Sequence, residues 1–106
     1  MPKYMFRASY TPTGAAGLLK EGGTKRTEAL GKLIGSVGGT VESMYWAFGA
    51  DDVYLTADLP DAGAAAAVSL QVGAAGGASV TTSELLTAQQ VDEIVRRKVD
   101  YRPPGK

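Results

Sequence analysis

The chain contains no histidine and no cysteine. Their absence excludes Ser-His-Asp and Cys-His nucleophilic catalysis, together with zinc, iron–sulfur and haem sites that use His or Cys ligands. It also excludes disulfides, so the fold does not require an oxidising compartment. Acid–base chemistry is left to Asp, Glu, Lys, Tyr or bound water. Because no clustered acidic motif is present either, we expect no metal ion and no cofactor.

Net charge and long hydrophobic runs are lacking as well. Eleven basic residues balance eleven acidic ones, which argues against nucleic acid or an anionic membrane as the main partner. The N-terminus has no apolar segment of about 7–15 residues, which a secretory signal needs. The most apolar stretch, 62–75, is interrupted and falls short of the about 20 residues of a membrane span. We therefore expect a cytoplasmic protein.

What is present is the composition of an ordinary soluble globular protein, with 44% hydrophobic and 21% charged residues. A chain of 106 residues has room for one domain with its own core. No internal repeat and no linker divides it. We expect a single domain over residues 1–100 and a C-terminal tail over residues 101–106.

Alternating apolar residues and a high content of β-branched and aromatic residues predict four strands. The segments are 3–10, 40–48, 52–59 and 78–86. The turn at 49–51 is so short that the second and third strands must form an antiparallel hairpin.

Apolar residues at helical spacing predict helices between these strands. Leu30, Leu33, Ile34 and Val37 mark a helix over 24–37, and Pro60-Asp61 starts an alanine-rich helix over 62–75. A short helical turn is expected at 15–20. Gly31 and Gly35 inside the first helix either permit a close backbone approach or are tolerated surface glycines.

A last helix follows the capping-box pattern of Thr87 and Gln90. Its expected inner stripe is Val91, Ile94 and Val95, with the basic residues 96–98 in its last turn, where cations suit the helix dipole.

The order of these elements predicts an α+β domain with the ferredoxin-like βαββαβ topology, a four-stranded antiparallel sheet and a C-terminal helix. Because both crossovers contain helices, we expect strands one and three, and strands two and four, to be parallel neighbours or next neighbours in a mixed antiparallel sheet. Two helices cover only one face of four strands. The other face mixes aromatic and polar side chains, so we expect sheets to pair in a homodimer or higher oligomer. Which face of strand 40–48 points to the helices stays open.

Several short motifs resemble those of the GYD domain, a small bacterial family. They are Tyr10-Thr11-x-x-Gly14, Arg26, Gly38-Gly39, Tyr45-Trp46, Gly49-x-x-Asp52, Pro60-Asp61 and Thr81-Thr82, and the resemblance covers about residues 3–98. It implies the fold of the dimeric α+β barrels, which pair their sheets back to back and include cofactor-free oxygenases, isomerases and haem enzymes. It implies no particular reaction. The chain departs from Gly-x-Tyr-Asp at Asp51, which stands at the tyrosine position.

Five residues are candidate ligand-binding residues: Arg7, Tyr45, Trp46, Asp52 and Tyr54. Arg7 could clamp an anionic or carbonyl-bearing ligand or pair with Asp58. The aromatic rings could line a pocket or serve as core and interface. Asp52 could orient a ligand or simply hydrogen-bond the backbone of a turn. The catalytic residues, if any, are not indicated.

We therefore expect an oligomeric small-molecule-binding protein, or a cofactor-free, enzyme-like one. Its pocket would lie between sheet and helices or at the dimer seam, with Arg7, Tyr54 or Trp46 converging on it. The alternative is a non-catalytic accessory protein whose sheet face serves only oligomerisation.

Overall fold

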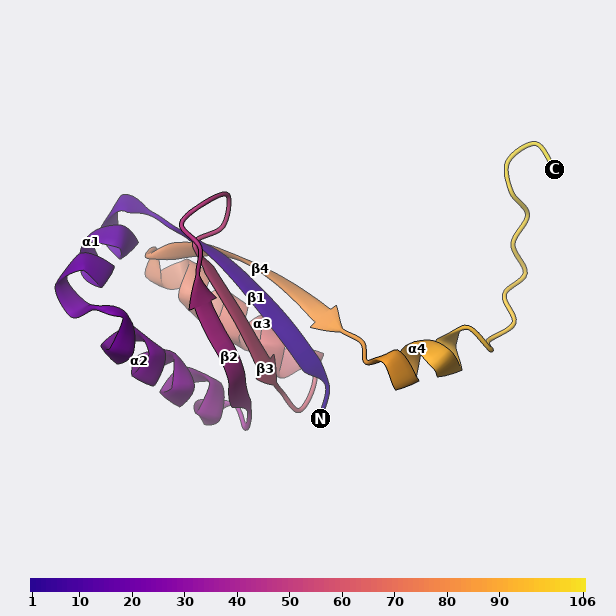
Figure 1. Cartoon of the computed structure of the whole chain (residues 1–106), viewed down its shortest axis with the longest axis horizontal. Helices are drawn as coiled ribbons and strands as arrows, with labels where there is room; N and C mark the ends of the chain where they lie inside the picture. Colours follow the sequence, from indigo (N-terminus) through magenta and orange to yellow (C-terminus); the bar gives the residue numbers. More distant parts are fainter.

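A computed structural model describes all 106 residues and has the predicted α+β architecture, with one four-stranded antiparallel sheet (Figure 1). The strands are β1 (Lys3–Tyr10), β2 (Thr40–Trp46), β3 (Val53–Asp58) and β4 (Ala78–Leu85). The helices are α1 (Pro12–Glu21), α2 (Gly23–Ser36), α3 (Ala62–Ala75) and α4 (Ala88–Ile94). No helix is long and apolar enough to cross a membrane. Pairing of sheets between copies stays a prediction.

The sheet order is β2-β3-β1-β4, and every neighbouring pair is antiparallel. The expected parallel relation of β1 to β3 was therefore wrong, because these strands are antiparallel neighbours at the centre of the sheet. The expected proximity of β2 and β4 was also wrong, since they form the two edges. The crossover through α1 and α2 joins β1 to β2, and β3 lies between these two strands in the sheet. The crossover through α3 joins β3 to β4, and β1 lies between them.

The helices α2 and α3 lie on one face of the sheet, and the core is between them and the strands (Figure 1). Its central residues are Tyr4, Phe6, Ile34, Leu55 and Leu59. No helix covers the opposite face, which we call the open sheet face. It carries the side chains of β1 to β4 that point away from α2 and α3.

The orientation of β2 depends on a β-bulge between Val41 and Ser43. Val41 and Met44 both pack against the core, although they are three residues apart and a regular strand would turn them to opposite faces. Beyond the bulge, Met44 pairs with Leu55 and Tyr45 pairs with Tyr54. Tyr45 therefore lies on the open sheet face. Simple alternation could not settle this point, because the extra residue shifts the pattern.

The segment after β1 is more helical than the predicted turn at 15–20, since α1 begins at Pro12 and has ten residues. Thr11 caps it by accepting a hydrogen bond from the Gly14 N–H, and Pro12 occupies the first turn. Proline is favoured there because its missing N–H would be unpaired in any case. Thr11-Pro12 is thus a helix start as well as a strand end.

The start of α3 is as predicted, with Asp61 accepting from the backbone N–H of Ala64 at 2.8 Å. Small side chains let this helix lie close to the sheet: Ala65 and Val68 are buried, and Ser69 hydrogen-bonds Thr82 of β4. Gly76 ends the helix in the left-handed conformation at φ 81°, which favours glycine.

The last helix differs most from its prediction. The capping box of Thr87 and Gln90 is present, but α4 ends at Ile94, so the basic residues 96–98 follow it instead of occupying its last turn. The expected inner stripe was also wrong for the single chain: Val91, Ile94 and Val95 are 43%, 39% and 73% exposed. Figure 1 shows why, because α4 and the tail extend beyond the end of the sheet.

Candidate functional site

Three of the five candidate residues form a row across the open sheet face. Tyr45 of β2 pairs with Tyr54 of β3, which pairs with Arg7 of β1, and Arg7 pairs with Thr81 of β4. The register places their side chains on one face, beside one another. The expected ion pair between Arg7 and Asp58 is not formed, since Asp58 pairs with Lys3 instead. The row is a surface where a second molecule could lie, not an internal pocket.

Trp46 and Asp52 lie apart from that row and are joined through Tyr10. The indole N–H of Trp46 donates to the Tyr10 hydroxyl at 3.0 Å, and the Tyr10 backbone N–H donates to the Asp52 carboxylate at 2.8 Å. The ring of Trp46 lies against Gly23 at the start of α2. The chain thus satisfies the indole N–H itself. Asp52 fits the backbone-bonding alternative, because it ties the start of β3 to the end of β1.

The cavity expected between sheet and helices is present, but Arg7, Trp46 and Tyr54 do not line it. It is a cleft of about 300 Å³ between α2 and α3, and seven of its ten lining residues are hydrophobic. Leu30 and Leu33 of α2, Val72 of α3 and Val53 of β3 form much of its wall. These four residues also line an apolar pocket of about 50 Å³ that reaches into the core. The two spaces therefore adjoin.

The polar side chains of the cleft are Arg26 of α2 and Gln71 of α3. Arg26 makes a loose ion pair with Glu21, at 3.7 Å between Nη1 and Oε2. A guanidinium has five N–H donors, so this one contact leaves donors for an anionic ligand. The cleft is lined by no carboxylate. It can bind and orient an anion, but its side chains supply no general base.

Arg26 and Gln71 are not among the predicted site residues, although Arg26 is one of the family motifs. A signal for Arg26 was available. It precedes Leu30 by four residues and Leu33 by seven, which places a cation on the same helix face as the apolar stripe. Gln71 gave a weaker signal, as one polar residue in an alanine-rich helix.

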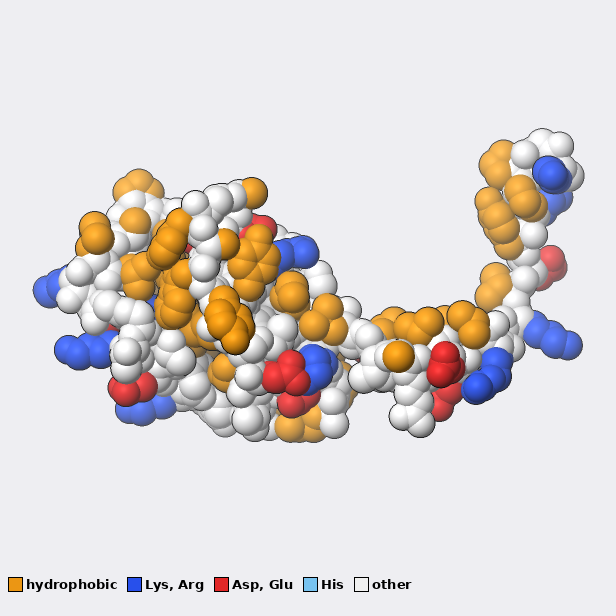
Figure 2. Space-filling model, viewed as in Figure 1, with side chains coloured by type: hydrophobic (Ala, Val, Ile, Leu, Met, Phe, Trp, Pro, Cys, Tyr) orange, Lys and Arg blue, Asp and Glu red, His pale blue; other side chains and the backbone are white.

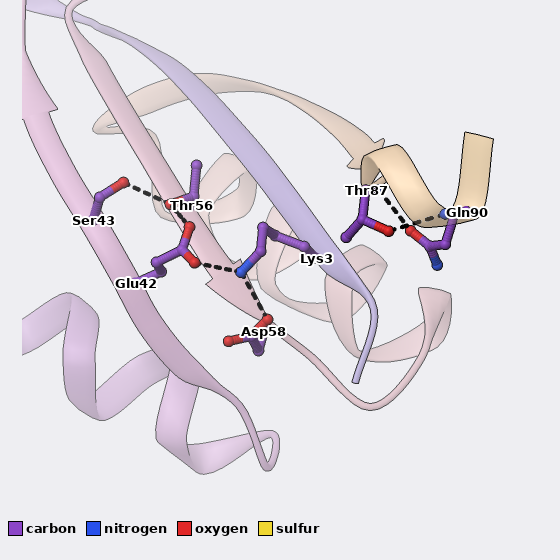
Figure 3. A network of polar contacts seen from close by, with 7 residues as sticks. All are labelled: Lys3, Glu42, Ser43, Thr56, Asp58, Thr87 and Gln90. Carbon is purple, nitrogen blue, oxygen red and sulfur yellow. Dashed lines mark hydrogen bonds and ion pairs between the residues drawn. The ribbon is translucent and has the colours of Figure 1, made fainter. Parts of the chain in front are cut away.

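A charged network occupies the open sheet face at the start of β1 (Figure 3). The Lys3 ammonium donates to Glu42 at 2.5 Å and to Asp58 at 3.0 Å. These hydrogen bonds raise the pKa of Lys3 above its usual value. The bond from Lys3, with a second from the Thr56 hydroxyl, lowers the pKa of Glu42. Two carboxylates thus share one cation. No group of three or more acidic side chains is placed to hold a metal ion.

A comparison with protein families identifies the chain. The model of the GYD domain matches residues 4–95, which is most of the sequence. The chain belongs to the GYD domain family. No characterised protein and no solved structure matches this GYD domain significantly.

Several of the motif residues of the GYD domain gather at one end of the sheet, beside the cleft, whereas Gly38-Gly39 and Pro60-Asp61 lie against each other at the opposite end, where β2 begins. Tyr10, Trp46 and Asp52 form the connected group described above. The Thr11 N–H donates to the carbonyl of Gly77, which lines the cleft, at 3.0 Å. Asp51, at the tyrosine position of the family motif, accepts from the Ser9 hydroxyl at 3.3 Å. These residues hold the ends of the strands together near the cleft, and Arg26 enters the cleft itself.

Proposed function

We propose that this GYD domain binds a small organic anion with an apolar body in the cleft between α2 and α3. The observation that carries the proposal is a largely apolar cleft of about 300 Å³ with a single cation, Arg26, in its wall. Ligand sites are concave and mainly apolar, with a few polar groups that fix orientation. A carboxylate or enolate would meet the guanidinium, and a hydrocarbon or aromatic group would lie against Leu30, Leu33 and Val72.

The chemistry of the cleft favours binding over independent acid–base catalysis. Its polar side chains are a guanidinium and an amide. A guanidinium stabilises negative charge but does not accept a proton near neutral pH. A reaction in this cleft would have to use the substrate's own acid–base groups or a bound water.

A ligand screen tests the cleft directly. Thermal unfolding is recorded with small aromatic and aliphatic carboxylates and with their neutral amides, and hits are titrated by NMR. We expect the acids to bind more tightly than the amides, with amide shifts at Leu30, Leu33 and Val72. The loss of a charge-assisted hydrogen bond costs about 1.5–3 kcal/mol, so Arg26→Gln should weaken binding roughly 10- to 100-fold.

The matched control is Lys25→Gln. Lys25 precedes Arg26 in α2, is exposed, makes no ion pair and does not line the cleft. Lys25→Gln removes the same charge as Arg26→Gln. Because Lys25 does not line the cleft, the affinity of this variant for the ligand should stay near that of the natural chain. Equal losses in both variants, or equal affinity for acids and amides, would contradict a specific role of Arg26.

We also propose that the open sheet face mediates self-association, which both the leading and the alternative interpretation of the sequence predict. The supporting observation is that a whole face of the sheet has no cover within the chain. Its row of Tyr45, Tyr54 and Arg7 offers two aromatic rings and an arginine, the residue types that carry most binding energy at protein interfaces. The cleft lies on the opposite face, so both functions are compatible in one molecule.

A further inference from the structure

The C-terminal segment of residues 86–106, which we call the arm, has no partner in its own chain. It leaves the end of β4 and extends past the sheet (Figure 1). Every residue of the arm is exposed, including all of α4. The body of the protein, residues 1–85, forms the core and the cleft without it.

The arm nevertheless carries much of the exposed apolar surface. Of the eleven large hydrophobic residues that are exposed, six lie in the arm: Leu86, Val91, Ile94, Val95, Val99 and Tyr101. Val91 and Ile94 share one side of α4, and Val95 continues that side directly after the helix. Figure 2 shows hydrophobic side chains along one side of this helix. An apolar stripe on a surface helix normally packs against another element.

A seven-residue helix needs such packing. Isolated helices shorter than about 12–15 residues are marginal in water, because the first turn is costly to form. The capping box satisfies the first backbone donors of α4, but it adds no apolar burial. Its N-cap residue Thr87 is extended, at φ −76° and ψ 162°, and the helix lies away from the body (Figure 1). The surface that stabilises α4 must therefore come from another molecule.

The size and shape of the chain are consistent with a second copy as that molecule. The accessible surface is 7225 Å², whereas a compact protein of 11.0 kDa exposes about 5600 Å². The radius of gyration is 16.8 Å, against about 13 Å for a compact domain of this length. The excess surface is about 1600 Å², and a stable interface buries about 800 Å² on each partner. The chain therefore exposes enough extra surface for a stable dimer.

The distribution of charge also favours a second copy of the chain as the partner of the arm. The arm has five basic and three acidic residues, and the body has six basic and eight acidic residues. The arm of one copy is thus complementary to the body of another. Beside the start of β1 on the open sheet face, Glu42 and Asp58 share the single ammonium of Lys3. This leaves a local excess of negative charge for the basic residues 96–98, because the other cation of the face, Arg7, lies four residues further along β1.

We propose that the arm packs the apolar stripe of α4 on the open sheet face of a second copy of this chain. The stripe meets hydrophobic side chains such as Met5 and Tyr45, and the basic residues after α4 approach Glu42 and Asp58. This inference rests on the self-association part of the proposed function and is independent of ligand binding in the cleft.

Paramagnetic broadening between copies tests the contact. Because the chain has no cysteine, Asp100→Cys gives a single site for a nitroxide label. Labelled protein without ¹⁵N is mixed with unlabelled ¹⁵N protein, and both are unfolded in urea and refolded together so that subunits mix. We expect broadening of amides in β2 and β3 of the ¹⁵N copy. Broadening confined to α2 and α3, or none, would overturn the proposal.

A matched pair of variants links the contact to assembly. Ile94→Asp places a charge in the apolar stripe, whereas Gln89→Asp places the same charge on the other side of α4. Ile94→Asp should abolish the broadening and raise the dimer dissociation constant about tenfold or more, measured by light scattering. Gln89→Asp should change neither. Equal effects of both substitutions would count against docking of the stripe.

The outcomes separate this inference from the proposed function. A dimer without broadening leaves pairing of the sheets intact and refutes docking of the arm. The mass is measured at 100 µM, a concentration chosen to reveal about micromolar affinity. If the protein remains an 11.0 kDa monomer there, both self-association proposals are refuted, and the proposal of ligand binding in the cleft is not affected. Cosedimentation of such a monomer with phosphatidylserine vesicles would assign the arm to a membrane surface instead, which also overturns the proposal.

Discussion

Gly14 lies where the first turn of α1 meets the Gly76-Gly77 turn before β4. The Thr11 hydroxyl donates to the carbonyl of Gly76 at 2.8 Å, and the Thr11 N–H donates to that of Gly77 at 3.0 Å. These bonds bring the two backbones so close that a Cβ atom at position 14 would overlap the carbonyl oxygen of Gly77. The residue is glycine because of this close approach.

Gly14→Ala should therefore lower the free energy of unfolding by about 1–3 kcal/mol, the usual cost of overpacking. Gly17→Ala is the matched control, because it adds the same methyl group to the same helix where nothing lies within 4 Å. That control should be neutral or stabilising by up to about 1 kcal/mol. Urea unfolding followed by the fluorescence of Trp46 measures both. An unchanged Gly14→Ala midpoint would contradict the close approach.

The hydrogen-bonded network of Lys3, Glu42, Thr56 and Asp58 makes the free energy of unfolding depend on pH. Hydrogen bonds from Lys3 and Thr56 lower the folded-state pKa of Glu42 below 4.5. The contribution of ionised Glu42 to the free energy of unfolding is thus complete above about pH 4.5, and it is lost as the pH falls through the folded-state pKa. The pKa of Lys3 is shifted in the opposite direction, upward from its usual value. The contribution of charged Lys3 to the free energy of unfolding is therefore complete below about pH 10.5, and it is lost as the pH rises through the folded-state pKa.

Glu42→Gln should reduce the loss of stability on acidification from pH 5 to pH 3, because its side chain no longer titrates. Urea midpoints at each pH measure this difference. Glu28→Gln is the control, since Glu28 is an exposed residue of α2 that makes no ion pair. Identical acid profiles for the natural chain and Glu42→Gln would refute a stabilising role of the network.

At the scale of elements, α2 contains two glycines that its packing does not require. Nothing lies within 4 Å of a Cβ atom at Gly31 or Gly35. They are therefore tolerated surface glycines and not points of close approach, which decides between the two interpretations left open by the sequence. Each weakens the helix relative to alanine, because glycine loses more backbone freedom on folding.

Gly31→Ala and Gly35→Ala should each raise the free energy of unfolding by up to about 1 kcal/mol. For a domain of this size, 1 kcal/mol corresponds to roughly 4–8 °C in melting temperature. The contrasting variant is Gly22→Ala, just before α2, where φ is 84° and an L-residue is strained. It should destabilise the fold. Calorimetry of the three variants checks the order, and a destabilising Gly31→Ala or Gly35→Ala would show an unrecognised contact.

For the whole molecule, the open sheet face is the feature on which the proposed self-association depends. Tyr45 is the most exposed aromatic residue of this face, at 72%. Trp46 cannot report on the face, because it lies on the helix side and bonds Tyr10. A charge at Trp46 would instead disturb the group formed with Tyr10 and Asp52.

Tyr45→Asp should therefore weaken self-association without unfolding the chain, as measured by light scattering and thermal unfolding at high and low concentration. Leu70→Asp is the control, since Leu70 is similarly exposed, at 73%, but lies on α3. We expect a clear loss of assembled mass for Tyr45→Asp and none for Leu70→Asp. The reverse order would assign the interface to the helix layer.

The sequence by itself determined the local features of this protein. Periodicity and caps predicted all four strands and the helices α2 and α3, because side-chain alternation and end-capping are properties of a short segment. The order of elements and the family motifs then predicted the ferredoxin-like topology. The absence of histidine and cysteine limited the possible chemistry without any knowledge of the structure.

Only the tertiary structure decided which side chains meet. It placed Arg7, Tyr45 and Tyr54 in a row on the open sheet face, because the strand register and the bulge in β2 set which strand residues face that side. It placed Arg26 in the cleft on the other side, because α2 packs against the opposite face of the sheet. It also showed that α4 packs on nothing in its own chain. An apolar stripe specifies that a helix is buried, but only the path of the chain in space determines what it can be buried against.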